Sequence, residues 1–236
     1  MQNFIAEPDS FTTDTVSLTG EEYYHATRSS RIKTGDIIGV TDGRGKRVEA
    51  RITSIDSRSL TAVIERDVSG IGEPLIHITV ALSLIKPSRF ELAAEKCTEI
   101  GARRFLPLIA RRCECKPERF KFDRLAKIIR QAAKQSGRSW VPDISAPVTP
   151  DNLLKHETDA VLAAIKTAEK RIPQILETIP GVRMVTLVIG PEGDFTDEER
   201  ECFISGGAIP FTLGRLMLRS ETAAITATAA AASFGK

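Results

Sequence analysis

The sequence predicts an α/β protein with a mostly parallel sheet, preceded by a small β-rich module. From residue 75 onward, apolar runs of strand length alternate with longer segments of helical periodicity, which is typical of βα units. The first 70 residues instead hold short runs separated by turn residues. With 236 residues, 42% of them hydrophobic, the chain is long enough for two domains and its composition argues against disorder.

The N-terminal module is expected to contain a β-hairpin. Two strand-like runs, residues 36–40 and 48–52, flank Asp42-Gly43-Arg44-Gly45-Lys46, and an Asp-Gly pair favours a tight hairpin turn. A third strand is expected at residues 60–64. Gly70-Ile71-Gly72-Glu73-Pro74 has the composition of a linker, so we expect one domain over residues 1–72 and a second over residues 73–236.

The second domain is expected to alternate strands with helices. Ser88 with Glu91 and Thr196 with Glu199 have the spacing of capping boxes, Ser220 has the position of an N-cap, and Gly101 and Gly137 follow helical segments. The expected strands are residues 76–85, 105–109, 159–165, 185–189 and 211–213. The expected helices are residues 88–100, 122–136, 196–206 and 220–233.

Composition excludes several classes of protein. Apolar runs of membrane-spanning length and a basic-then-apolar leader are both missing, so we expect a cytoplasmic protein with no membrane partner. The cysteines, Cys97, Cys113, Cys115 and Cys202, are too scattered for a disulfide framework. They are also far from the three histidines in sequence, so no metal site is expected.

Positive charge is concentrated in one segment. Residues 103–138 hold twelve Lys or Arg and three Asp or Glu, a local net charge of +9, whereas the whole chain carries +2. In the expected helix 122–136, apolar residues such as Leu125 and Ile129 occupy one side and basic residues such as Arg124 and Lys134 the other. A solvated charged face is the ordinary explanation for one helix, but a soluble face usually mixes signs. The excess therefore favours a polyanionic partner, without distinguishing RNA from DNA.

The turn Ile189-Gly190-Pro191-Glu192-Gly193-Asp194-Phe195 follows an apolar run, residues 184–188, that reads as a buried parallel strand. Ligands collect at the carboxyl ends of such strands, and glycine allows close approach to the backbone. A second turn, Leu213-Gly214-Arg215, closes the next strand, so the two favour one shared pocket. Neither turn is a Walker loop or a dinucleotide fingerprint, and an ordinary structural turn explains the glycines equally well.

Gly190-Pro191-Glu192-Gly193 and the segment at residues 213–223, Leu-Gly-Arg-Leu-Met-Leu-Arg-Ser-Glu-Thr-Ala, resemble the ribosomal RNA small subunit methyltransferase E family. The resemblance extends to Lys96-Cys97-Thr98-Glu99-Ile100-Gly101, to residues 131–138, and to residues 25–43 of the N-terminal module. It covers nearly the whole chain in order, although Gln131 and Lys134 stand where the family often has Glu.

The resemblance implies a fold and an activity. The implied fold is a SPOUT methyltransferase domain with a C-terminal trefoil knot, preceded by a PUA-like RNA-binding β-barrel. Physics alone disfavours a knot, since threaded chains are rare. The implied activity is S-adenosylmethionine-dependent methylation of uracil N3 in the decoding region of 16S rRNA, within the assembled small subunit, by a homodimer.

Site roles follow from the resemblance and from the chemistry of methyl transfer. Arg219 is expected to stabilise negative charge on a uracil carbonyl, and Glu221 is either a base or a residue that suits the helix dipole. The residues expected to contact the cofactor are Ala164, Ile165, Gly190, Glu192, Gly193, Leu213, Gly214, Leu218 and Thr222. The residues expected to contact RNA are Arg28, Arg31, Arg111, Arg112, Arg124, Gln135, Ser136 and Arg138.

Two other classes of function stay open. A non-catalytic RNA-binding ribosome assembly factor needs only the β module and the basic segment. A metabolic enzyme that uses a nucleotide would leave the +9 segment without a purpose.

Overall fold

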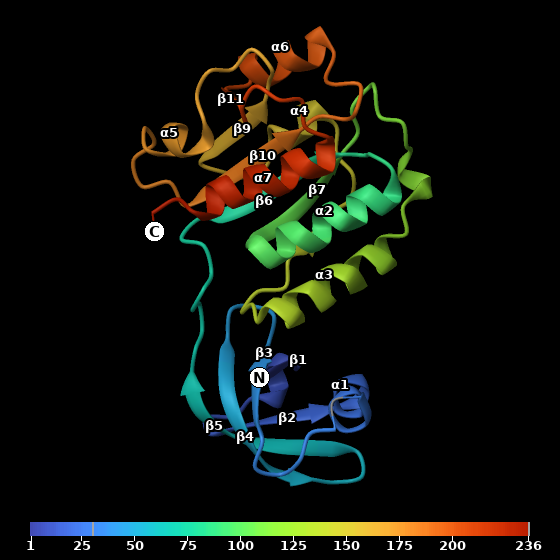
Figure 1. Ribbon diagram of the computed structural model, residues 1–236, viewed down its shortest axis with the longest axis vertical. Helices are drawn as coiled ribbons and strands as arrows, with labels where there is room; N and C mark the ends of the chain where they lie inside the picture. The colour runs from blue at the N-terminus through green and yellow to red at the C-terminus, as the bar shows by residue number, and fades with distance from the viewer. Residues whose placement is uncertain (30, 236) are drawn as a thin grey trace. The chain divides into compact units, whose positions relative to one another are not determined.

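The computed structural model describes residues 1–29 and 31–235, which form two compact units (Figure 1). The first unit consists of Met1–Glu73 with Gln131–Val141, and the second of Pro74–Arg130 with Pro142–Lys236. The chain therefore passes from the first unit to the second, returns, and leaves again. One boundary is expected after residue 72, whereas the structure also places an eleven-residue segment, 131–141, in the first unit.

The first unit is built on a five-stranded sheet in the order β1-β3-β4-β5-β2. Its strands are β1 (Gln2–Ile5), β2 (Thr15–Thr19), β3 (Ile37–Thr41), β4 (Arg47–Ile55) and β5 (Ser59–Asp67). β1 is parallel to β3 and the other pairs are antiparallel. The expected hairpin is β3–β4, and the Asp42 carboxylate stabilises its turn by accepting from the N–H groups of Arg44 and Lys46.

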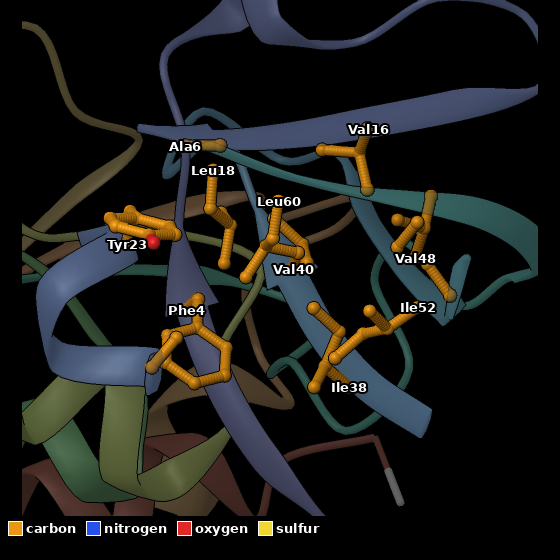
Figure 2. Close-up of a cluster of buried hydrophobic side chains, with 13 residues drawn as sticks. Phe4, Ala6, Val16, Leu18, Tyr23, Ile38, Val40, Val48, Ile52 and Leu60 are labelled. Atoms are coloured by element: carbon orange, nitrogen blue, oxygen red, sulfur yellow. The ribbon is translucent and has the colours of Figure 1, made fainter. Parts of the chain in front are cut away.

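Alternate side chains of these strands point to one core, as Figure 2 shows. Phe4, Val40 and Leu60 from three strands are fully buried there, and Tyr23 from the short helix α1 (Gly20–Tyr24) covers one side. The remaining short elements are the 3-10 helix η1 (Pro8–Ser10) and the π-helical turn η2 (His25–Ser29). β1, β2 and α1 were not expected, because their apolar residues are few and the segments are short.

The returning segment completes this unit. The Ser139 carbonyl accepts hydrogen bonds from the Thr41 hydroxyl (2.9 Å) and from the Gly45 N–H (3.0 Å). The Trp140 ring lies where a side chain on Gly45 would project, and Gly45 has φ +118°, so only glycine fits this turn. Residues 131–141 are thus part of the first unit's packing.

The second unit contains a fully parallel six-stranded sheet in the order β11-β9-β10-β6-β7-β8. Its strands are β6 (His77–Ser83), β7 (Ala102–Leu108), β8 (Asp143–Ile144), β9 (Ala160–Ala164), β10 (Met184–Ile189) and β11 (Ile209–Phe211). This confirms the predicted α/β class. The last strand, expected at residues 211–213, lies two residues earlier, because Thr212 and Gly214 already form a turn in which the Thr212 hydroxyl accepts from the Gly214 N–H.

Helices cover both faces of this sheet. α2 (Pro87–Ile100) and α7 (Ser220–Ala232) lie side by side on one face, and α5 (Ile172–Leu176) contacts α7 (Figure 1). On the other face, Leu153 of α4 (Pro150–Leu153) and Phe203 of α6 (Asp197–Ser205) pack in one cluster with Val188 and Leu106 of the strands. The 3-10 helix η3 (Pro117–Arg119) precedes α3 (Phe122–Ser136), whose bounds are those expected.

Two predicted helix N-caps, Ser88 and Ser220, are wrong. α2 begins at Pro87 with Lys86 as N-cap, so Ser88 does not cap it and Glu91 binds Arg124 instead. α7 begins at Ser220 with Arg219 as N-cap, so Ser220 is the first helical residue. The capping box of Thr196 and Glu199 is confirmed. Among the described residues, no helix is long and apolar enough to cross a membrane.

Candidate functional site

Three of the expected cofactor segments meet at one edge of the parallel sheet. β11, β9 and β10 are neighbours and end at Phe211, Ala164 and Ile189, so the loops that follow them leave from the same edge. The N–H of Ile165 donates to the Phe211 carbonyl at 3.2 Å, and the N–H of Thr212 donates to the Lys170 carbonyl at 2.9 Å. The fold therefore brings together residues that are more than 40 positions apart in sequence.

The loop after β10, residues 190–195, is held closely against the fold. A Cβ atom on Gly190 would lie 3.3 Å from the ring of Phe195, which is fully buried. Asp194 has φ +60°, and its N–H donates to the Pro191 carbonyl at 2.9 Å. Glu192 and Gly193 are exposed between these anchors. A ligand at this edge can therefore reach their main chain.

Ion pairs join this glycine loop to its neighbours. The Asp194 carboxylate lies 3.3 Å from the ammonium of Lys166, in the loop after β9, and 3.8 Å from the guanidinium of Arg200 in α6. Lys166 directly follows the expected cofactor residues Ala164 and Ile165, both of which are half-buried. The loop after β9 and the loop after β10 are thus connected electrostatically.

The third loop, residues 212–219, is the most exposed part of this edge. Gly214 has φ +118°, a conformation that favours glycine, and its surroundings are open. Leu213 and Leu218 are half-buried, but Leu216 and Met217 are 84% and 74% exposed. Two large apolar side chains in water are an unusual feature that a ligand or a partner would cover.

The start of α7 carries the two expected catalytic residues. Arg219 is exposed, with extended main chain and no capping hydrogen bond from its side chain. Glu221, in the first helical turn, is only 7% exposed, whereas Thr222 beside it is exposed. A carboxylate near a helix N-terminus is stabilised by the helix dipole.

Arg89 was not among the expected site residues, yet it lies between two of them. Its guanidinium is 3.5 Å from a Glu192 carboxylate oxygen and 3.8 Å from a Glu221 oxygen, measured from Nη1 and Nε respectively. Arg89 is in the first turn of α2, which follows β6, the neighbour of β10 in the sheet. The signal available in the sequence was its position just after a strand that ends at the same edge.

Two of the expected RNA-binding arginines adjoin the glycine loop. Arg112 donates from Nη1 to the Gly193 carbonyl at 3.0 Å, and the main-chain N–H of Arg111 donates to Glu199 at 2.7 Å. Both arginines are exposed. The pKa of the neighbouring Glu198 is lowered, mainly by the Thr196 hydroxyl and further by the charges of Arg111 and Arg112. Positive charge therefore stands beside the loop that is exposed to a ligand.

Comparison with known proteins agrees with this geometry. A family model for an RNA methyltransferase domain matches residues 72–232, and a model for an RNA methyltransferase PUA domain matches residues 18–65. A ribosomal RNA small subunit methyltransferase E from Synechocystis is 33% identical over 95% of this chain and 75% of its own length.

The chain belongs to the ribosomal RNA small subunit methyltransferase E family.

Other relatives carry the same description. The small subunit methyltransferase E of Mycobacterium bovis is 31% identical over 88% of this chain and 82% of its own length. The crystal structure of methyltransferase E from Neisseria gonorrhoeae, bound to S-adenosyl methionine, superposes with a TM-score of 0.83 at 28% identity, covering 98% of this chain and 96% of that chain. The predicted SPOUT-type domain with a PUA-like module is therefore confirmed, and the protein is an RNA methyltransferase.

In this methyltransferase E chain, three other expected RNA-binding residues already have partners. Arg124 is 65% exposed and forms a two-point ion pair with Glu91 at 2.8 and 3.1 Å. The Ser136 hydroxyl donates to the Ala132 carbonyl at 2.6 Å, while Gln135 is exposed. Arg138 is 6% exposed and is paired with Glu73. Arg138 thus contributes to the interior of the first unit.

The expected RNA-binding residues of the N-terminal module are at the surface. Arg28 is exposed and its guanidinium lies 5.1 Å from the centre of the Tyr24 ring. Arg31 is exposed and has φ +50°, which is uncommon for a residue with a side chain. Ser30, between them, lies outside the described residues. Across residues 1–29 and 31–235, His, Cys, Asp and Glu form no group of three or more that is arranged to hold a metal ion.

Proposed function

We propose that this protein transfers a methyl group from S-adenosylmethionine to N3 of a uridine in the decoding region of 16S rRNA. The observation that carries the proposal is the meeting of three loops at one sheet edge, with exposed main chain at Glu192 and Gly193 and with Arg111 and Arg112 beside it. The methyltransferase E relative crystallised with S-adenosyl methionine supports the choice of cofactor.

The residues at this edge fit that cofactor. Exposed main-chain groups suit the polar parts of a nucleoside, and the half-buried Leu213 and Leu218 suit an adenine ring. We assign contacts to the three loops and to the first turn of α7. The assigned residues are Ala164, Ile165, Gly190, Glu192, Gly193, Leu213, Gly214, Leu218 and Thr222. Bound there, S-adenosylmethionine supplies an electrophilic methyl group on a sulfonium.

The protein must then handle the proton on uracil N3. As the methyl carbon bonds to N3, the N3–H proton leaves and negative charge develops on the uracil carbonyl oxygens. The exposed guanidinium of Arg219 is assigned to stabilise that charge, since an oriented cation is most effective where charge develops. Glu221, in the first turn of α7, is assigned as the second catalytic residue.

RNA contacts and assembly complete the proposal. Arg28, Arg31, Arg111, Arg112, Arg124 and Gln135 are exposed and are assigned to RNA in the small subunit, whereas Arg138 is reassigned to fold stability. The proposal also includes a homodimer that covers Leu216 and Met217, and the exposure of these two side chains supports it. A C-terminal trefoil knot and a cytoplasmic location are further parts of the proposal.

The test is mass spectrometry of 16S rRNA from cells that lack this protein. We expect N3-methyluridine to be lost at one decoding-region site, to be restored by the wild-type gene, and not to be restored by Arg219→Ala. A control variant, Arg51→Gln, removes an exposed arginine of the first unit and should restore methylation. Unchanged N3-methyluridine without the protein would exclude this activity, and calorimetry without binding of S-adenosylmethionine would favour the assembly-factor alternative.

A further inference from the structure

Two buried polar atoms are left without partners, both at the same sheet edge. Among residues 1–29 and 31–235, the only fully buried side-chain oxygen or nitrogen atoms without a hydrogen bond are Ser83 Oγ and Glu221 Oε2. Ser83 is the last residue of β6, and Glu221 lies in the first turn of α7, which follows the third loop. Leaving a buried polar group unpaired is costly, and such groups in native proteins commonly mark a function.

Glu221 is the more demanding of the two, because a carboxylate is charged. Its other oxygen, Oε1, lies 3.8 Å from Arg89, a distance that gives electrostatic attraction but no good hydrogen bond. Arg89 also faces Glu192 at 3.5 Å. One guanidinium therefore stands between two carboxylates, and the three groups together carry one net negative charge.

This arrangement joins three separate elements. Arg89 is at the start of α2, Glu192 is in the glycine loop, and Glu221 is at the start of α7. The side chain of Arg89 is 30% exposed, and the side chains of Glu192 and Glu221 are 20% and 9% exposed. Because an arginine held by charges from two sides has few free orientations, it fixes the two carboxylates relative to each other.

We propose that Arg89 is a positioning residue and that the unpaired oxygen of Glu221 accepts a hydrogen bond from an N–H donor of the bound ligand. This inference rests on the proposed function. Two groups of the reacting pair have that chemistry: the α-ammonium of S-adenosylmethionine and the imide N–H of the target uracil. Either one satisfies the buried oxygen and compensates the net negative charge of the cluster.

The third loop leads directly into the helical turn that carries Glu221. Residues 213–219 directly precede α7, and Leu216 and Met217 make little contact with the rest of the fold. A loop with few buried contacts changes conformation at low cost.

The first experiment measures binding by calorimetry with full-length protein. The probes are S-adenosylhomocysteine, which has the α-ammonium, and 5′-methylthioadenosine, which lacks the amino-acid part. If the ammonium is the donor, Glu221→Gln lowers the affinity for S-adenosylhomocysteine by about tenfold to a hundredfold. The affinity for 5′-methylthioadenosine then changes by less than about twofold. If the uracil is the donor, Glu221→Gln leaves the affinities for both probes unchanged. In that case kcat on small-subunit rRNA falls about tenfold or more, and KM for S-adenosylmethionine is unchanged. Normal affinities together with normal kcat overturn the inference.

The second experiment separates positioning from simple charge balance. Arg89→Ala leaves Glu221 uncompensated, so it should lower both thermal stability and ligand affinity, and Arg89→Lys should recover part of each. In the double variant Arg89→Ala with Glu221→Gln, stability should recover because no buried charge remains, but affinity or kcat should stay low. Full recovery of binding and turnover in the double variant would mean that the pair is only structural.

Controls keep the inference distinct from the function on which it rests. Arg51→Gln removes an arginine paired with Glu65 in the first unit and should leave both probes and kcat as in the wild type. Wild-type protein that fails to bind S-adenosylmethionine would refute the proposed function. Wild-type protein that binds and methylates, with Glu221→Gln unaffected, would refute this inference alone.

Discussion

The guanidinium of Arg138 and the carboxylate of Glu73 form an ion pair that is largely removed from water. Their side chains are 6% and 12% exposed, and Nη2 lies 2.6 Å from Oε2. Glu73 also accepts from the N–H groups of Ser139 and Trp140. A buried pair adds little net stability, but the loss of one partner leaves an unpaired charge in the interior.

Arg138→Ala should therefore destabilise the first unit by about 3 kcal/mol, because Glu73 would be left buried and unpaired. Chemical denaturation followed by the fluorescence of Trp140, the one tryptophan of the chain, measures this change. The control is Arg51→Ala, which breaks an exposed pair with Glu65 and should cost less than about 1 kcal/mol. Equal stability of the two variants would show that the Arg138 pair is unimportant.

Burial raises the pKa of the Cys97 thiol to about 12, because its thiolate would have no water around it; the hydrogen bond from the Thr228 hydroxyl at 3.3 Å opposes the shift. The ordinary thiol pKa is about 9, so on alkaline titration the unfolded chain loses this proton first. The contribution to stability is therefore complete below about pH 9 and is lost as pH rises from 9 toward 12.

In the folded protein at pH 8, Cys97 should react with iodoacetamide at least about a hundredfold more slowly than the half-exposed Cys202. Peptide mass spectrometry after timed labelling measures both rates. In denaturant the two rates should become similar, and a persistent difference there would point to local sequence instead of burial.

At the scale of elements, one carboxylate fixes the start of α6 and a neighbouring segment together. Glu199 is 6% exposed; one of its oxygens accepts from the Thr196 N–H at 2.9 Å and the other from the Arg111 N–H at 2.7 Å. The helix cap and the segment that carries Arg111 and Arg112 thus share a single side chain. This segment in turn contacts the Gly193 carbonyl.

Glu199→Ala should lower the free energy of unfolding by about 2 kcal/mol, since it removes a cap and leaves two donors without their acceptor. It should also weaken S-adenosylmethionine binding, because the glycine loop loses its support. Thermal denaturation and calorimetry measure the two effects. Glu201→Ala, an exposed change in the same helix, is the control and should alter neither.

The sequence predicted those elements whose signal is local. The bounds of α3 followed from its apolar periodicity, and the start of α6 from Thr196 and Glu199. The start of α2 was wrong because Pro87 suits the first helical position and moves the cap to Lys86. The pairing of Arg89 with Glu221 joins positions more than 130 residues apart, and no local pattern encodes such a contact.

At the scale of the whole molecule, the +9 segment is less available to RNA than its charge implies. Lys134 and Arg138 are buried in ion pairs with Glu22 and Glu73, and Arg124 is paired with Glu91. The sequence could predict the excess but not these partners, which lie in distant segments. Arg111 and Arg112 remain exposed beside the glycine loop.

Changing both Arg111 and Arg112 to Ala should reduce the salt dependence of rRNA binding. Each lost phosphate contact lowers the slope of log affinity against log salt by about 0.7 to 0.9, so the double variant should lose about 1.4 to 1.8. Filter binding or fluorescence anisotropy over a salt series measures the slope. As a control, changing Arg51 and Arg66 to Gln removes the same number of charges from exposed ion pairs and should leave the slope nearly unchanged. Equal slopes for the two double variants would mean that Arg111 and Arg112 do not contact RNA phosphates.

The discontinuous first unit has a consequence for how the protein is made. Its sheet is encoded by the first 73 residues, yet Thr41, Gly45 and Glu73 find their partners in the segment at residues 131–141. During translation residues 1–73 emerge from the ribosome before the segment at residues 131–141 has been synthesised. The first unit cannot complete its packing until nearly sixty further residues have been added. A nascent chain that ends before Ser139 should therefore be cleaved by proteases that do not cleave the full-length protein.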